Sequence, residues 1–154
     1  FGTYYLHMAF YSHAGTFFLE SIILGGSVGS MATAILVVNN LRDIKNDEKH
    51  GKRTLAVFLG EKFTKIEYLF LMIIAYLIPI YISYYALDNK SSIYIIYFTL
   101  PISVRLVLQV FFEEGHSLNK TLEGTAKLLL LYTILFSFGI IVWILKKLNL
   151  IHIN

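Results

Sequence analysis

TFFLESIILGGSVGSMATAILVV, residues 16–38, has a single charged side chain, Glu20, close to its start. A helix needs roughly 20 mainly apolar residues to cross the hydrocarbon core of a bilayer, and this stretch is long enough. The small residues between Gly25 and Ser30 permit close packing against neighbouring helices. We therefore predict that residues 16–38 form a membrane-spanning helix.

The rest of the chain has the same character. Of its 154 residues, 56% are hydrophobic and 15% are charged, against about 25% charged in a typical soluble domain. Residues 1–11 are apolar and aromatic but short, which indicates the tail of a helix whose beginning is missing. The sequence predicts an all-α integral membrane protein with four complete transmembrane helices plus part of a fifth. The other complete spans are residues 66–87, 93–112 and 128–144.

Composition excludes several classes of site. The chain has no Cys, so thiolate metal sites, disulfides and Cys nucleophiles are excluded. Its net charge of +3 is compatible with nucleic-acid binding. However, the Lys and Arg residues gather at the ends of apolar runs, which is typical of anchoring at a membrane–water boundary. We expect the lipid bilayer, and no nucleic acid, among the partners.

The loops predict an orientation. Seven of the thirteen Lys and Arg residues lie in the 39–65 loop, whereas the loop after the next span has only Lys90. Because positively charged loops tend to stay in the cytoplasm, we expect the 39–65 and 113–126 loops to be cytoplasmic in a multi-pass protein of the cell (inner, cytoplasmic) membrane. The C-terminus is then outside. Lys146 and Lys147 conflict with this orientation, but the denser cluster should carry more weight.

The most polar part of the chain, NNLRDIKNDEKHGKRTLAV at residues 39–57, directly follows the first span. If the helix continues past Asn40, successive side chains advance by about 100°. Two carboxylates with amide oxygens suit Mg²⁺, which commonly bridges to substrate phosphates. A solvated helix end with salt bridges is the alternative. The side chains that share one face of about 120° are Asn39, Asn40, Asp43, Asn46, Asp47 and His50.

Basic residues accompany this face. Arg42, Lys45 and Lys49 fall on a separate basic flank of the same helix. Gly51 would end the helix, and Lys52 and Arg53 would then be donors beside the metal, where a diphosphate could bind. For Lys52 and Arg53, plain anchoring at the cytoplasmic surface is the alternative.

The extended motif NNLRDIKNDEKHGKRTLAVFLG, residues 39–60, resembles the second aspartate-rich motif of the UbiA-type membrane prenyltransferases. Its paired Asn residues and its GKRTLAV segment are similar to the 1,4-dihydroxy-2-naphthoate polyprenyltransferase branch of that family. Weaker similarities occur at residues 2–6, 100–105 and 118–126. The resemblance covers essentially the whole chain. It implies that residues 1–154 are the C-terminal half of a nine-helix UbiA-type bundle, without the first aspartate-rich motif.

The resemblance implies a reaction. A polyprenyl group would pass from polyprenyl diphosphate to 1,4-dihydroxy-2-naphthoate, giving demethylmenaquinone in menaquinone biosynthesis. Mg²⁺ and basic side chains would stabilise the diphosphate as the allylic bond ionises. Residue by residue, the resemblance implies that Asp43 and Asp47 are the catalytic, metal-binding residues and that Asn39 assists them. The basic positions near the diphosphate are Arg42, Lys52 and Arg53.

Two further sets of residues are candidates for substrate contact. Arg105 lies inside the predicted 93–112 span, where a charge is costly and usually faces a cavity or a partner. It is a candidate for the diphosphate, and snorkelling toward the cytoplasm is the alternative. Tyr4 and Tyr5 are candidates for the acceptor pocket.

Other functions stay open at this point. A sister prenyltransferase that uses 4-hydroxybenzoate or another aromatic acceptor would share the metal chemistry. A non-catalytic membrane or transport protein would keep the charged loop for topology alone. Transporters tend to place ionisable groups at mid-membrane, whereas the acids here lie at the membrane edge, which favours an enzyme. Because only one aspartate-rich cluster is present, we expect the 154-residue chain alone to be inactive and to need the missing N-terminal half as a partner.

Overall fold

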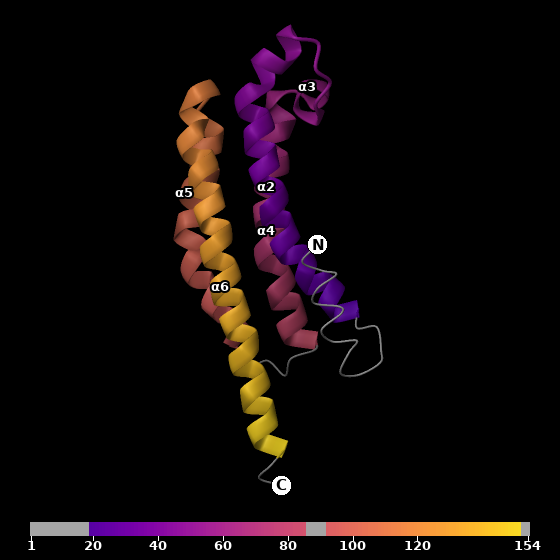
Figure 1. The fold of residues 1–154 in the computed structure, drawn as a ribbon, viewed down its shortest axis with the longest axis vertical. Coiled ribbons are helices and arrows are strands. Elements are labelled where there is room, and N and C mark those ends of the chain that lie inside the picture. The colour runs from indigo at the N-terminus through magenta and orange to yellow at the C-terminus, as the bar shows by residue number, and fades with distance from the viewer. Residues whose placement is uncertain (1–18, 86–91, 152–154) are drawn as a thin grey trace.

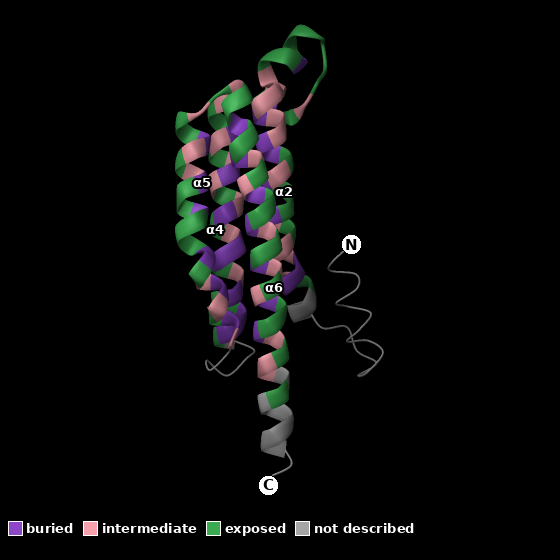
Figure 2. Ribbon diagram, turned by 60° about the vertical axis from the view of Figure 1, so that its left-hand side comes forward, coloured by how far each residue is buried: buried purple, intermediate pink, exposed green. Residues whose placement is uncertain are grey.

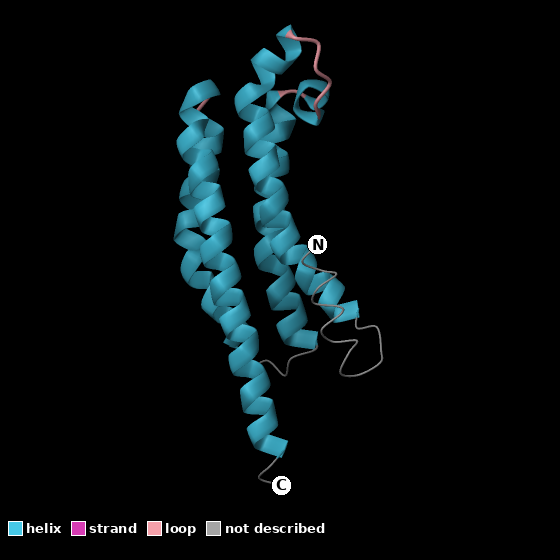
Figure 3. Ribbon diagram, in the orientation of Figure 1, coloured by secondary structure: helices cyan, strands magenta, loops and turns pink. Residues whose placement is uncertain are grey.

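The computed structural model describes residues 19–85 and 92–151, and in this part of the chain every regular element is helical (Figure 1 and Figure 3). The predicted partial span at residues 1–11 lies outside it. The long helices are α2 (Leu19–Lys49), α4 (Glu61–Tyr85), α5 (Leu100–Phe112) and α6 (Leu118–Ile151). The short elements are the α-helix α3 (Leu55–Leu59) and the 3₁₀ helices η1 (Ser92–Thr99) and η2 (Gly115–Ser117).

Four helical segments in the described part of the chain are long and apolar enough to cross a membrane. The predicted all-α membrane architecture with four spans is therefore confirmed. η1 and α5 together make the third span. Pro101 occupies the first turn of α5, where the missing N–H of proline has no intrahelical partner to lose. The four segments are Ile22–Lys49, Glu61–Tyr84, Ser92–Phe112 and Gly115–Trp143.

The helices extend further at one end than the apolar runs predict. α2 continues to Lys49, as the predicted helical face requires. α6 begins at Leu118, so the expected 113–126 loop is a short turn with η2, followed by helix. The reason is that Leu118, Thr121 and Thr125 are all buried against the bundle. This helical spacing of buried residues is hidden when hydropathy is averaged over a polar stretch.

The long helices form an antiparallel bundle (Figure 1). α2 packs against α4 and α6, and α5 packs against the same two helices, so α2 and α5 lie on opposite sides of the bundle. The α2–α4 connection and the α5–α6 turn lie at one end, at the top of Figure 1, and the C-terminal end of α6 lies at the other. The two polar segments that we expected on one side of the membrane are thus at the same end of the bundle.

Buried residues lie on the helix faces that pack together, and exposed residues cover the outside of the bundle (Figure 2). Many of the exposed side chains are large and apolar, such as Phe98, which suits contact with lipid tails. Inside the bundle, Ser27 Oγ and the Tyr132 hydroxyl both donate to the backbone oxygen of Ala75, at 2.7 and 2.6 Å. These bonds tie α2 and α6 to α4, and so fix the helix that carries the predicted site.

Candidate active site

The end of α2 carries the predicted metal-binding face. Because the helix is continuous through this segment, Asp43 and Asp47 lie about one turn apart on one face. Gly51 follows with a φ of 69°, a left-handed conformation that glycine adopts without strain. The N–H groups of Gly51 and Lys52 donate to the carbonyls of Glu48 and Asp47, at 3.1 and 2.9 Å. This is the Schellman pattern that closes a helix, and the predicted helix end at Gly51 is confirmed.

The chain reversal at Gly51 brings Lys52 onto Asp47. Lys52 Nζ lies 3.2 Å from Oδ1 and 3.3 Å from Oδ2 of Asp47. The Asp47 side chain is 7% exposed and the Lys52 side chain is 63% exposed. A nearly buried carboxylate is costly without a partner. Lys52 supplies that partner while its ammonium group remains open to solvent.

Asp43 is paired with its neighbour Arg42. Arg42 Nε donates to Oδ1 of Asp43 at 2.8 Å and Nη2 donates to Oδ2 at 2.6 Å, a bidentate arrangement. Nη2 also donates to Asn39 Oδ1 at 3.0 Å, and Nη1 donates to Asn119 Oδ1 of α6 at 3.1 Å. The predicted separation of Arg42 on a basic flank is wrong for its guanidinium group, because the long side chain reaches round to the acidic face.

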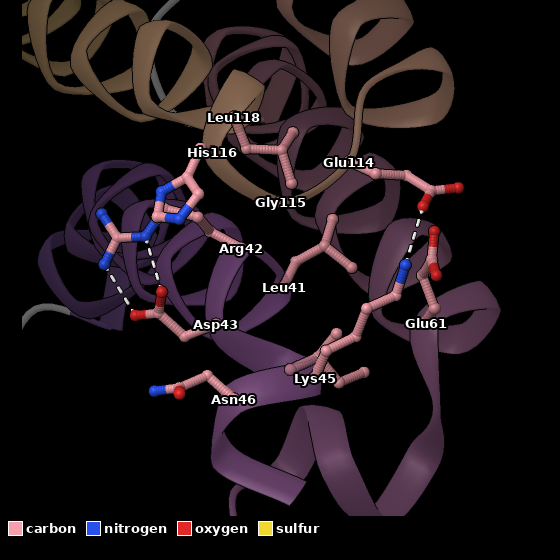
Figure 4. A pocket seen from close by; sticks show the side chains of 11 residues that line it. Leu41, Arg42, Asp43, Lys45, Asn46, Glu61, Glu114, Gly115, His116 and Leu118 are labelled. Carbon is pink, nitrogen blue, oxygen red and sulfur yellow. Dashed lines mark hydrogen bonds and ion pairs between the residues drawn. The ribbon is translucent and has the colours of Figure 1, made fainter. Parts of the chain in front are cut away.

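A cavity of about 420 Å³ opens beside Arg42 and Asp43, between α2, the start of α4 and η2 (Figure 4). Lys45 Nζ lies 3.1 Å from Glu114 Oε2 at its edge, and this hydrogen bond holds the pKa of Glu114 below its usual value. Acidic and basic groups therefore surround an apolar floor, a lining that suits a small polar molecule. The other residues that line the cavity are Leu41, Ile44, Asn46, Glu61, Gly115, His116 and Leu118.

Sequence comparison decides the family. Residues 1–122 match the family model for the UbiA prenyltransferase family. The chain belongs to this family. It is 32% identical over 148 residues to the 1,4-dihydroxy-2-naphthoate octaprenyltransferase of Haemophilus influenzae, covering 92% of this chain and 44% of that protein. The protein of the same name from Escherichia coli K12 is 33% identical over 138 residues, covering 86% of this chain and 43% of that protein.

A UbiA-family protein with a different name is also similar. The UbiA prenyltransferase domain-containing protein 1 of Homo sapiens is 30% identical over 141 residues, covering 92% of this chain and 40% of that protein. The chain therefore spans less than half the length of each of these three relatives. No solved structure matches it.

UbiA-family prenyltransferases generally use Mg²⁺, and the donor atoms at the end of α2 fit this ion. Asp43 and Asp47 offer carboxylate oxygens and Asn39 offers an amide oxygen, which are the ligands that Mg²⁺ prefers. Among residues 19–85 and 92–151, no group of three or more His, Cys, Asp or Glu side chains is placed to hold a metal ion. Further oxygen ligands would therefore have to come from outside these described residues, and phosphate and water are ligands that Mg²⁺ commonly keeps.

Not every predicted site residue of this UbiA-family chain lies near Asp43. Arg53 is exposed in the turn that follows α2. Arg105 is exposed on α5, beside a separate hollow of about 360 Å³ that shares no lining residue with the cavity at Asp43. Since α5 and α2 lie on opposite sides of the bundle, the described chain does not bring Arg105 to the aspartates. Tyr4 and Tyr5 lie outside the described residues.

Three side chains at the cavity or on Arg42 are absent from the sequence prediction: Glu114, His116 and Asn119. They belong to the α5–α6 turn and the first turn of α6, and Asn119 lies 77 positions from Arg42 in the chain. The similarity of residues 118–126 to the family was the one available signal, and it gave no role to Asn119. Their approach to α2 depends on the antiparallel return of α6, which spacing along the chain does not reveal.

Proposed function

We propose that the full-length protein transfers a polyprenyl group from polyprenyl diphosphate to 1,4-dihydroxy-2-naphthoate, giving demethylmenaquinone. The observation that carries this proposal is the end of α2, where Asp43 and Asp47 lie one turn apart with Arg42 and Lys52 on their carboxylates. The acceptor is proposed because two similar proteins are named 1,4-dihydroxy-2-naphthoate octaprenyltransferases.

The acidic side chains at the end of α2 would bind the metal, and the basic side chains would bind the diphosphate. Asp43 and Asp47, with Asn39, would hold Mg²⁺. Bound there, Mg²⁺ supplies positive charge that stabilises a departing diphosphate. Arg42 and Lys52 would turn from the carboxylates to the diphosphate, because guanidinium and ammonium groups form charge-assisted hydrogen bonds with phosphate. Arg53, in the same turn, would add a third positive charge.

The same face of α2 offers a path for the prenyl chain. Below Asp43 it continues through Leu36, Ala32 and Gly29, whose spacings of seven, four and three residues keep them on one side of the helix. All three are exposed in the described bundle. An apolar surface that begins at the carboxylates would keep the reacting allylic group away from water. Given the positive charge of residues 39–65, we propose that this site lies at the cytoplasmic side of the cell membrane.

Carboxylate-to-amide variants of the full-length protein test the proposal. Asp43→Asn and Asp47→Asn should each abolish prenyl transfer to 1,4-dihydroxy-2-naphthoate at saturating Mg²⁺, while the protein remains folded. Glu123→Gln is the matched control, because Glu123 is an exposed carboxylate on α6 that pairs with Lys127 at 2.6 Å, outside the cavity beside Asp43. Wild-type turnover in either Asp variant would remove that residue from the mechanism.

A second acceptor class is supported by one observation. The human relative is nearly as similar as the two naphthoate enzymes, and its name states no acceptor. A UbiA-family prenyltransferase that uses another phenol, such as 4-hydroxybenzoate, would need the same metal site. Competition between the two acceptors in one assay, with the prenylated products separated by chromatography, decides between them. Preferential prenylation of 4-hydroxybenzoate would reject the naphthoate assignment and leave the role of the aspartates intact.

A further inference from the structure

Arg42 is held by more than its salt bridge. Its guanidinium group donates to Asp43 through Nε and Nη2, to Asn39 through Nη2 and to Asn119 through Nη1. Asp43 and Asn39 belong to α2, as Arg42 does, whereas Asn119 comes from α6. Asn119 therefore fixes the orientation of the guanidinium plane from a second helix, at the edge that the α2 acceptors leave unused.

Asn119 stands on a rigid support. It directly follows Leu118, which is 1% exposed, and Thr121, two positions later, is also buried. Just before it, Ser117 Oγ donates to the Glu114 carbonyl at 2.7 Å and accepts from the Glu114 N–H at 3.1 Å, which closes the turn. The Asn119 side chain itself is exposed. A substitution at Asn119 should therefore leave the core intact while it alters the bond to Arg42.

The hydrogen bond from Arg42 to Asn119 becomes more important when Asp43 binds a metal ion. If Asp43 turns its oxygens to a metal ion, Arg42 loses both bonds of its bidentate pair. An unrestrained arginine carries about 2 kcal/mol of rotamer entropy. Without these bonds, the Arg42 side chain would therefore populate several rotamers. Because Asn39 would turn its oxygen to the metal as well, Asn119 remains as the neutral acceptor that holds Nη1, and the Nε edge becomes available to an anion.

We propose that Asn119 is a positioning residue for the diphosphate site, which holds the Arg42 guanidinium group ready for a diphosphate while Asp43 binds the metal. This inference rests on the proposed function. Asn119 does not touch the reacting atoms and acts through Arg42. Its removal should weaken the binding of Mg²⁺ with diphosphate more than it affects folding.

Calorimetry on the full-length protein in detergent, with Mg²⁺ and inorganic diphosphate as the probe, tests the inference. Asn119→Leu keeps the size and removes the acceptor, and it should raise the Kd by about tenfold, since a hydrogen bond to a charged group contributes about 1.5 kcal/mol or more. Asn119→Gln keeps a neutral amide oxygen as acceptor and should stay within about threefold of wild type. Lys120→Ala, an exposed neighbour on the same turn, should bind as wild type does.

A double-mutant cycle shows whether Asn119 acts through Arg42. In the Arg42→Lys background the fork that Asn119 holds is gone, so Asn119→Leu should have no further effect on the Kd. The inference is overturned if Asn119→Leu binds as wild type does, if Leu and Gln weaken binding equally, or if the loss persists undiminished in the Arg42→Lys background. If Asn119→Leu does not purify as a folded protein, Asn119→Ala replaces it in the cycle.

The prenyl-transfer assay tests the proposed function separately from the calorimetry. There Asn119→Leu should raise the KM for the prenyl diphosphate more than it lowers kcat. A wild-type protein that binds Mg²⁺ with diphosphate but transfers no prenyl group would refute the function, while calorimetry still decides the role of Asn119. A wild-type protein that does not bind this pair would overturn both.

Discussion

Replacing Gly139 by Ala should destabilise the bundle. Gly139 lies where α6 passes the start of η1, and the site has no room for a methyl group. A Cβ atom there would lie 2.8 Å from the Ser92 carbonyl oxygen, 2.9 Å from Ile93 Cα and 3.1 Å from Ile93 N. All three are backbone atoms, so no side chain can rotate away. η1 and α6 would have to move apart, although η1 begins the third membrane span.

The expected cost follows from two opposing effects. Alanine is favoured over glycine inside a helix by about 1 kcal/mol. Overfilling a packed site typically costs about 1–3 kcal/mol, and a collision with backbone favours the upper part of that range. We therefore expect Gly139→Ala to lower the free energy of unfolding by about 1–2 kcal/mol.

Gly26→Ala is the matched control, because Gly26 also lies inside a long helix. A Cβ atom there would meet Ile78 Cδ1 at 3.5 Å, an ordinary contact, so this variant should gain about 0.5–1 kcal/mol. Unfolding of the purified protein in mixed micelles by added SDS, followed by circular dichroism, measures both variants. A Gly139→Ala protein as stable as Gly26→Ala would refute the close backbone approach of η1 to α6.

The remaining predictions concern orientation and pH. In this cysteine-free chain, a membrane-impermeant thiol reagent applied to intact cells should label an Asn154→Cys variant and leave a Lys52→Cys variant unlabelled; the reverse pattern would overturn the orientation. Glu114→Gln should slightly lower the free energy of unfolding at pH 7. This difference from wild type should disappear as the pH falls through the lowered pKa of Glu114, because protonation of Glu114 ends its pairing with Lys45. SDS unfolding across this pH range measures it, and a difference that grows on acidification would contradict the pairing.

The number of spans was predictable because a bilayer leaves a chain few choices. Backbone polar groups must be satisfied within the membrane, so an apolar run of sufficient length becomes a helix. The helix limits were less predictable. α6 starts at Leu118 because Thr121 and Thr125 are buried there, with the Thr125 hydroxyl donating to the Thr121 carbonyl at 2.7 Å. Threonine at a buried position looks polar in a hydropathy average, so the hydropathy pattern predicts a loop where the first turns of this helix lie.

The helical face that carries Asp43 and Asp47 was predictable, and the pairing of these two acids was not. The four-residue spacing of Asp43 and Asp47 and the glycine at position 51 define a helical face and its end from the sequence alone. Arg42 points elsewhere on a helical wheel, and only its side-chain conformation brings it to Asp43. A wheel describes where Cβ atoms point and is least informative for the longest side chains. Arg105 shows a related limit, because its position within a span does not reveal whether its face of the helix turns toward the aspartates or away from them.

The pairing of each acid with its own base has a consequence for the proposed binding of Mg²⁺ and diphosphate. Asp43 and Asp47 bring two negative charges and Arg42 and Lys52 bring two positive charges, so the four side chains balance. Mg²⁺ alone would have to displace the two bases from the carboxylates, and diphosphate alone would have to displace the carboxylates from the bases, so neither gains a net charge attraction from the neutral cluster. When both bind, the carboxylates can face the metal and the bases the diphosphate. Each should then raise the affinity of the other by linkage, which is why the calorimetry supplies the two together, and tight binding of Mg²⁺ without diphosphate would contradict this charge balance.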